Sequence, residues 1–422
     1  MSLRLEDLKY DALHCVRCSN CKWMDHVYMK SYRFSQICPS LKRYLFDAYS
    51  CQGRLDIALA IMNKKLEYTP TLLDIIYKCT LCGACDVMCK RCMDLEPLQV
   101  LEALRVKWIE SGGEILPEHR KLIENIENTN NIYGEAHERR LESISKEVVL
   151  KEKADVIYFV GCASAYKYPE IAHATIEILR KCETEFTLLY PDEWCCGNPL
   201  YAIGRIDLMK KVMEHNLKAI RETGASVVIT SCAACYKTLK VDYPKLLKKS
   251  TDEMEFKVMH IVEYLDRLLK DGRLKLKELN MKLTYHDPCQ LGRLSEPWIH
   301  WEGKRKKYGL LDPPKKFRRG TYGVYDPPRN LLKSIRGVEL IEMERIKENA
   351  WCCGAGGGVK QAFPDFALWT ASERLEEAKA TGAEAIVTAC PFCKENFEDA
   401  AKAAGEKIKV YDITEIIRKV LV

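Results

Sequence analysis

The stretch TGASVVITSCAAC at residues 223–235 occurs a second time, in similar form, as TGAEAIVTACPFC at residues 381–393. In each copy a glycine suited to end a helix precedes a short β-branched run, and a Cys-x-x-Cys pair follows that run directly. Open α/β sheets place their functional sites beyond the carboxyl ends of the strands. The duplication therefore predicts two α/β halves, related by a pseudo-twofold axis, with a cysteine pair at that end of each sheet.

Further cysteines repeat around the two stretches. The first set is Cys162, Cys195, Cys196, Cys232 and Cys235, and the second is Cys289, Cys352, Cys353, Cys390 and Cys393. The spacings agree, because 35 residues separate Cys196 from Cys232 and 36 separate Cys353 from Cys390. Five thiolates are one more than a cubane [4Fe-4S] cluster or a tetrahedral zinc ion needs. Each set could therefore hold a less common centre.

The pattern of strands and helices supports this division of the chain. Short β-branched or aromatic runs alternate with long amphipathic stretches from residue 154 onward, as is typical of α/β units. The predicted strands are Val156–Val160, Phe186–Leu189, Val227–Thr230, Lys282–His286, Val338–Glu342, Ala385–Thr388 and Ile408–Tyr411. We expect α/β domains at residues 154–280 and 281–422, preceded by a charged helical connector at residues 113–153.

The first 112 residues hold 10 of the 21 cysteines and are expected to form a helical, ferredoxin-like domain, with one helix at Arg54–Asn63. The run Cys79-x-x-Cys82-x-x-Cys85-x-x-x-Cys89 matches the one that bacterial ferredoxins use for a [4Fe-4S] cubane. A second run, Cys15-x-x-Cys18-x-x-Cys21, has its fourth cysteine displaced to Cys38, before Pro39. The fourth cysteine of such a run ligates the other cluster in two-cluster folds.

This crossed arrangement predicts two cubane clusters in the N-terminal domain. One would be held by Cys15, Cys18, Cys21 and Cys89, and the other by Cys79, Cys82, Cys85 and Cys38. Structural zinc is the alternative, although zinc sites favour pairs of Cys-x-x-Cys knuckles over triplets. Of the remaining cysteines, Cys51 and Cys182 are expected to be small buried apolar residues. Cys92 is close enough to Cys89 to be an alternative ligand.

Two further motifs lie beside the second cysteine set. His286 stands three residues before Cys289 and has two interpretations: it donates a proton to a nascent thiolate, or it simply bonds to backbone or to Asp287. The loop Gly354-Ala355-Gly356-Gly357-Gly358 fits neither the P-loop nor the dinucleotide fingerprint. Its glycines would let backbone N–H groups approach cluster sulfides. With no flavin or nicotinamide motif legible, electrons are expected to arrive from another subunit.

Composition sets the outer limits. The 422 residues are 47% hydrophobic and 30% charged, which describes a globular protein of several domains. The chain shows neither a signal-peptide core nor an apolar run of about 20 residues, so it is expected to be cytoplasmic and not itself membrane-spanning. Cysteines in a reducing compartment are metal ligands or redox groups before they are disulfides. Residues 298–330 carry nine Lys and Arg against three acidic residues, which predicts attraction for an anionic substrate or subunit rather than for nucleic acid.

The chain resembles the CCG-domain iron-sulfur proteins related to the catalytic subunit of heterodisulfide reductase. The resemblance is carried by Val160-Gly161-Cys162, Trp194-Cys195-Cys196-Gly197, Ser231-Cys232-x-x-Cys235, His286-Asp287-Pro288-Cys289, Tyr325-Asp326-Pro327-Pro328-Arg329 and Trp351-Cys352-Cys353-Gly354-Ala355-Gly356-Gly357-Gly358. With the ferredoxin-type region in front, the order of the chain is similar to that of the fused D-type subunit. One departure is a longer gap of 62 residues between Cys289 and Cys352, against 32 between Cys162 and Cys195, and the excess includes the basic segment 298–330.

The resemblance implies that each five-cysteine set binds a noncubane [4Fe-4S] cluster and that the facing pair of clusters cleaves a disulfide. Electrons would enter singly through the two cubanes, with His286 or water protonating the thiolates. We therefore expect a thiol:disulfide oxidoreductase subunit acting on a small heterodisulfide. The alternative is a non-catalytic electron-transfer subunit of a larger anaerobic complex, serving a benzoyl-CoA-type reductase, lactate or glycolate oxidation, or a quinone-linked system. Expected partners in a hetero-oligomer are a flavoprotein, a ferredoxin or a membrane cytochrome b, the last of which would bring the chain to the inner face of the membrane.

Overall fold

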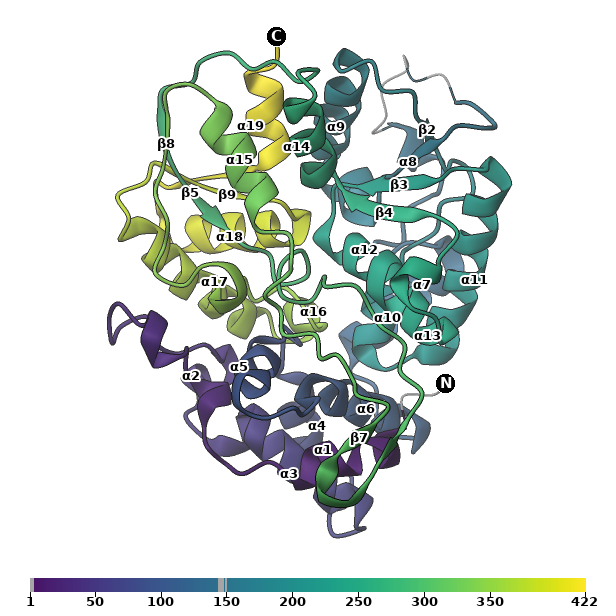
Figure 1. Ribbon diagram of the computed structural model, residues 1–422, viewed down its shortest axis with the longest axis vertical. Helices are drawn as coiled ribbons and strands as arrows, with labels where there is room; N and C mark the ends of the chain where they lie inside the picture. The colour runs from purple at the N-terminus through teal and green to yellow at the C-terminus, as the bar shows by residue number, and fades with distance from the viewer. Residues whose placement is uncertain (1–3, 143–147, 149) are drawn as a thin grey trace.

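The computed structural model describes residues 4–142, 148 and 150–422. A helical N-terminal region lies below two α/β units that stand side by side (Figure 1). Residues 1–3 of the expected N-terminal domain, and residues 143–147 and 149 of the expected connector, lie outside the described residues. Within the described parts of the chain, no helix combines the length and apolar character that a membrane span requires.

The N-terminal region is built from short helices, as predicted. They are α1 (Lys9–Leu13), α2 (Pro39–Tyr44), α3 (Cys51–Met62), α4 (Pro70–Tyr77), α5 (Ala84–Cys92) and α6 (Pro97–Glu110). Proline opens α2, α4 and α6, where its missing N–H costs nothing because the first helical N–H groups have no intrahelical partner. Helix α3 includes the stretch expected to be helical at Arg54–Asn63 except Asn63, which is its C-cap residue. The connector then forms α7 (Pro117–Thr129) and α8 (Arg139–Glu142).

The two α/β units contain parallel four-stranded sheets of the same topology. The first sheet has β1 (Val156–Phe159), β2 (Thr187–Leu188), β3 (Val227–Thr230) and β4 (Lys257–His260), in the order β2-β1-β3-β4. The second has β5 (Met281–His286), β8 (Val338–Leu340), β9 (Ala385–Thr388) and β10 (Lys409–Asp412), in the equivalent order β8-β5-β9-β10. All the pairings in both sheets are parallel. The predicted pair of α/β halves is thereby confirmed.

All seven predicted strands are present, but β4 of the first parallel sheet was missed, as were the two short strands of a hairpin in the segment 298–330. The sequence of β4, Lys257-Val258-Met259-His260, runs without a turn into α14 (Ile261–Lys270), so the apolar pattern of the strand merges with that of the helix. The remaining helices of the first unit are α9 (Pro169–Lys181), α10 (Asn198–Ile203), α11 (Ile206–Thr223), α12 (Ala233–Lys237) and α13 (Tyr243–Leu247). Those of the second are α15 (Asp326–Ser334), α16 (Val359–Ala362), α17 (Pro364–Lys379), α18 (Pro391–Ala404) and α19 (Ile413–Lys419).

The two units pack through equivalent helices. Helix α9 packs on α19 and α14 packs on α15, so each contact pairs the helix after a first strand with the helix after the other unit's fourth strand (Figure 1). Buried side chains of both sheets belong to one continuous hydrophobic core. The pseudo-twofold arrangement therefore brings the same ends of both sheets toward a shared interface.

The basic segment 298–330 lies on the N-terminal region. Its short hairpin pairs β6 (Lys304–Arg305) with β7 (Leu311–Asp312) and lies over α1 (Figure 1). The Arg305 guanidinium stacks 3.7 Å from the centre of the Tyr10 ring and lies 3.9 Å from the Asp11 carboxylate. The extra length of the second unit thus links it to the helix that precedes Cys15.

One buried arginine joins all three parts of the molecule. Arg105 of α6 is 1% exposed, and its guanidinium donates to the carbonyl oxygens of Cys79 at 2.6 Å, Ala202 at 2.7 Å and Gly357 at 2.7 Å. These acceptors belong to the N-terminal region, the first unit and the second unit respectively. Charged donors form the stronger protein hydrogen bonds, and buried carbonyls without a donor are costly.

We predict that Arg105→Met lowers the free energy of unfolding by about 3 kcal/mol or more, because it leaves several buried carbonyls without a donor. Urea unfolding of the metal-free chain measures the loss, and limited proteolysis of the connector reports loosening. Arg221→Met is the control, since Arg221 and Glu255 form an exposed ion pair whose removal should cost no more than about 0.5 kcal/mol. Equal effects of the two substitutions would contradict the role of Arg105.

Candidate functional site

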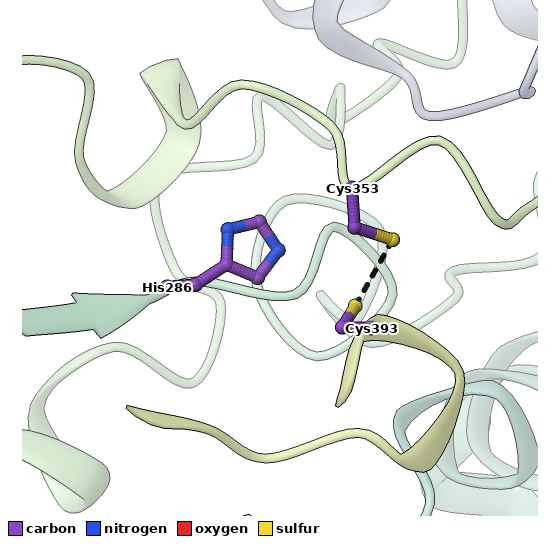
Figure 2. A group of neighbouring side chains, drawn as sticks. All are labelled: His286, Cys353 and Cys393. Carbon is purple, nitrogen blue, oxygen red and sulfur yellow. Dashed lines mark hydrogen bonds between the residues drawn. The ribbon is translucent and has the colours of Figure 1, made fainter. Parts of the chain in front are cut away.

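The second five-cysteine set converges at the carboxyl ends of its strands. The Sγ atoms of Cys353 and Cys393 are 3.2 Å apart (Figure 2). The Cys352 thiol contacts those of Cys289 and Cys353, and the Cys390 thiol contacts that of Cys393. Four of the five are at most 5% exposed, and Cys289 is half-buried. The fold thus brings together the side chains of cysteines that lie up to about 100 residues apart in the sequence.

The first set converges in the same way. The Cys195 thiol contacts those of Cys162 and Cys196, and the Cys235 thiol contacts those of Cys196 and Cys232. All five side chains are at most 6% exposed. The fold thus brings the five cysteines of each set together, as predicted. The ligand role of each residue stays a prediction.

The Cys-Cys-Gly turns explain why a glycine follows each cysteine pair. Gly197 and Gly354 adopt φ values of +85° and +92°, in the left-handed region that favours glycine. In that conformation Gly197 N–H points at Cys195 Sγ at 3.4 Å, and Gly354 N–H points at Cys352 Sγ at 3.3 Å. Each turn therefore supplies a backbone donor to a sulfur, which stabilises a thiolate there.

The Cys-x-x-Cys pairs sit at helix N-termini. Cys232 and Cys390 are the N-cap residues of α12 and α18, directly after β3 and β9. The unpaired N–H groups of a first helical turn and the helix dipole favour negative charge at this end. The helical backbone that begins with α12 continues through a π-helical stretch at Thr238–Asp242 into α13, so the two helical runs are of similar length. Both units therefore aim a positive helix end at their cysteines.

The two sets face each other across the interface of the units. The Cys232 thiol of the first set contacts the Cys390 thiol of the second. A cavity of about 60 Å³ lies at this junction. It is lined by Cys289, Cys353, Cys390 and Cys393, by residues 355–358 of the glycine-rich loop, and by Ala233 and Ala234 of α12. A larger cleft, about 1140 Å³ between β4 and the basic segment, is lined by no cysteine and lies apart from this chemistry.

The N-terminal cysteines form two neighbouring groups. Cys38, Cys79, Cys82 and Cys85 line one small cavity together. The Cys89 thiol lies in the electrostatic range of Cys85 as well as of Cys21 and Cys15, while Cys18 is exposed. Cys38 thus lies with the second run, as the crossed grouping expects, whereas the run that Cys89 joins stays a prediction. In addition, Cys82 contacts Cys352, so this group touches the second five-cysteine set.

The donors at these sites fit iron-sulfur clusters. Every group offers several thiols, and burial raises the pKa of the Cys38 and Cys89 thiols far above its ordinary value. Bare thiols at these positions would stay protonated at neutral pH, whereas coordination to a metal deprotonates them. Clusters with several iron atoms can share five thiolates, while a tetrahedral zinc ion accepts four ligands. The chemistry of the donor set therefore favours iron-sulfur centres over zinc.

His286 lies behind the second set rather than in the cavity. It ends β5, is 1% exposed, and its Nδ1 accepts a hydrogen bond from Arg374 Nε at 3.2 Å. The other nitrogen, Nε2, points toward Cys353 and Cys393 (Figure 2), and a ring nitrogen of His286 lies within 4.8 Å of both sulfur atoms. Burial lowers the pKa of His286, which favours the neutral ring over the charged one. Asp287 pairs instead with Arg329 at 2.7 and 2.9 Å.

The three remaining cysteines have different surroundings. Cys51, 3% exposed, contacts the thiols of Cys21 and Cys85 and so lies between the two N-terminal groups. Cys182 is buried at the end of α9, as expected, and its carbonyl accepts from Arg273. Cys92 is exposed and accepts from Asn20 Nδ2 at 3.2 Å. The position of Cys51 was not apparent from the sequence, because no spacing rule connects it to either run.

Buried arginines are the functional neighbours that the sequence analysis missed. Arg293, 4% exposed, donates to the carbonyl oxygens of Cys82 and Ala350 at 2.6 Å each and faces the thiols of Cys82, Cys289 and Cys352. Arg374 orients His286. The sequence marks these residues only as two of 66 basic residues, since their positions depend on tertiary packing.

We predict that Gly354→Ala lowers bound iron, because a Cβ there would lie 2.6 Å from the Ala367 carbonyl oxygen and would displace the N–H that points at Cys352. Gly382→Ala is the matched control: its φ is +72°, but a Cβ there meets nothing within 4 Å. The control should cost about 1 kcal/mol of backbone strain and keep its iron. Iron analysis after anaerobic reconstitution tests the pair, and equal iron in both variants would contradict the prediction.

Comparison with known proteins gives the same picture. The Cysteine-rich domain model matches residues 156–240 and 314–398. The chain is 34% identical to the D subunit of dihydromethanophenazine:CoB–CoM heterodisulfide reductase of Methanosarcina acetivorans, over 96% of this chain and 93% of that one. It is 31% identical to the B subunit of fumarate reductase (CoM/CoB) of Methanothermobacter marburgensis, over 81% of this chain and 61% of that one. It is 28% identical to an EtfAB:quinone oxidoreductase of Syntrophomonas wolfei, over 85% of this chain and 48% of that one. The chain therefore belongs to the family of iron-sulfur oxidoreductases that includes the D subunit of heterodisulfide reductase.

Proposed function

We propose that this chain is the disulfide-reducing component of a redox complex, passing single electrons through two cubane clusters to two noncubane [4Fe-4S] clusters. The observation that carries the proposal is the contact of Cys232 with Cys390, which brings two complete five-cysteine sets face to face beside a cavity. When bound, the clusters supply one-electron transfer and iron sites with affinity for sulfur. The reaction adds two electrons and two protons to a disulfide and yields two thiols.

The proposed ligands follow the contacts. The first noncubane site would use Cys162, Cys195, Cys196, Cys232 and Cys235, and the second Cys289, Cys352, Cys353, Cys390 and Cys393. The cubane sites would use Cys15, Cys18, Cys21 and Cys89, and Cys79, Cys82, Cys85 and Cys38. The contact of Cys82 with Cys352 supports entry of electrons at the second five-cysteine set.

The cavity at the junction is the proposed site for the disulfide. Residues 355–358 include three glycines, so the substrate would meet backbone rather than side chains along this wall. His286 is not among the lining residues, and its Nε2 is directed at Cys353. We therefore propose that the two protons come from water that enters the cavity, and that His286 acts on the cysteine set in front of it instead.

A second candidate function is electron transfer without disulfide reduction. The observation that favours it is the basic hairpin over α1, which is part of no cavity wall at the five-cysteine sets but lies next to the helix before Cys15. Its Tyr308 is 86% exposed, beside the cationic Lys306 and Lys307. A flavoprotein, a ferredoxin or a membrane cytochrome b docked there would deliver electrons near the exposed Cys18.

We predict about 16 iron atoms per chain in the anaerobically purified protein, from four clusters of four iron atoms each. The same preparation should oxidise reduced viologen when given the heterodisulfide of coenzymes M and B. Iron, acid-labile sulfide and zinc analysis, followed by this assay, tests both parts.

The outcomes separate the two functions. About 16 iron atoms without turnover would leave the electron-transfer function and refute disulfide reduction. About 8 iron atoms, with or without zinc, would refute the noncubane sites and leave only the two cubanes.

A further inference from the structure

The ring of His286 is held in one orientation by a buried network. Arg374 Nε donates to its Nδ1 at 3.2 Å, and Arg374 Nη1 donates to Glu377 Oε2 at 2.6 Å. Glu377 in turn accepts from Arg345 Nε at 3.0 Å, and these three charged side chains are at most 1% exposed. The guanidinium of Arg374 is thus fixed at both of its contacts. Consequently Nδ1 faces an N–H donor that cannot swing away.

This contact decides which ring nitrogen carries the hydrogen. A nitrogen that accepts from Arg374 carries no hydrogen, so the one hydrogen on the ring nitrogens is on Nε2. Among the described residues Nε2 is a buried polar atom without a hydrogen-bond partner, and it is directed at the sulfur atoms of Cys353 and Cys393 (Figure 2), which lie within 4.8 Å of a ring nitrogen. Metal-bound histidines show the opposite arrangement, in which the ligating nitrogen is bare and the other nitrogen donates its hydrogen to a protein acceptor. Here Arg374 offers no acceptor, so His286 is built as a hydrogen-bond donor to sulfur and not as an iron ligand.

The first unit has no such donor at the equivalent position. Phe159 pairs with Thr230 across β1 and β3 just as His286 pairs with Thr388 across β5 and β9, and each precedes the first cysteine of its set by three residues. Phe159 is fully buried but its ring has no N–H to offer. The backbone donors at Gly197 and Gly354 are equivalent in the two units. The side-chain donor at this position therefore belongs to one unit alone.

We propose that His286 is a positioning residue that raises the reduction potential of the centre held by the second five-cysteine set, through an Nε2–H···S hydrogen bond to Cys353. This inference rests on the proposed function, which places a cluster at that set. A donor to a ligating thiolate stabilises the extra negative charge of the reduced cluster, and hydrogen bonds to sulfur are among the main determinants of cluster potential. The centre that touches the N-terminal group through Cys82 and Cys352 is thus the better electron acceptor of the two.

The test is a redox titration followed by EPR on the fully clustered protein. His286→Phe copies the residue of the first unit, and the second centre should become harder to reduce by about tenfold in its equilibrium constant, which is about 59 mV for a one-electron couple. His286→Gln should recover part of the shift, because its amide can accept from Arg374 and donate to Cys353. Phe159→Leu is the matched control and should leave both noncubane potentials unchanged.

A second measurement uses the unaltered chain labelled with ¹⁵N-histidine. Pulsed EPR of the reduced protein should show an exchangeable proton and a weak nitrogen coupling at one noncubane centre. A strong nitrogen coupling, as from direct iron ligation, would overturn the inference, and so would the absence of both signals.

The failure of this inference is distinguishable from failure of the proposed function. About 16 iron atoms with equal potentials in wild type and His286→Phe would refute the role of His286 and leave the noncubane sites intact. About 8 iron atoms in the wild type would refute both, because the second set would then hold no cluster.

Discussion

The concentration of sulfur ligands inside the protein is the constraint on which the rest of the structure depends. Buried thiolates and clusters carry negative charge into a region of low dielectric, where charge must be matched by fixed donors. Guanidinium groups are suited to this because they stay protonated and present several N–H donors in one plane. Arg105 beside Cys79, Arg293 beside Cys82 and Cys352, and Arg140 beside Cys162 place such groups at three of the four cysteine groups.

The same arginines hold the molecule together. Arg105 and Arg293 donate to carbonyl oxygens of the N-terminal region and of the α/β units at once. Charge compensation and assembly of the three regions are therefore one interaction. This coupling would have a functional consequence under the proposed function, because electron transfer between clusters held by these cysteine groups would require a fixed spacing. A loose junction between Cys82 and Cys352 would separate the N-terminal group from the second set.

The sequence was sufficient to predict the strands and the convergence of the cysteine sets, but not the tertiary contacts of individual side chains. Strand-to-cysteine order is local, so the strands before Cys232 and Cys390 and the convergence of both sets followed from the repeat. Strand β4 was missed because its three buried residues run directly into α14. The position of Cys51 between two groups and the hydrogen bonds that hold His286 depend on residues distant in the chain, and so does the contact of Cys232 with Cys390, which only the family resemblance implied as a facing pair of clusters. Periodicity and spacing carry no information on such contacts.

Duplication explains why the two α/β units share one topology, and divergence between the copies makes their two cysteine sites unequal. The α14 and α19 caps show how far positions can drift, because His260 and Asp412 both cap the helix after a fourth strand while differing in charge. Burial raises the pKa of Asp412 to about 7, whereas it lowers that of His260 to about 3. The two cap residues therefore change protonation in different pH ranges. Within the described parts of the chain, the basic hairpin and the Nε2–H of His286 likewise belong to the second side only. Two equal centres would share an incoming electron without preference. Under the proposed function, an unequal pair with the N-terminal group touching one member would order the arrival of two electrons at a disulfide held between them.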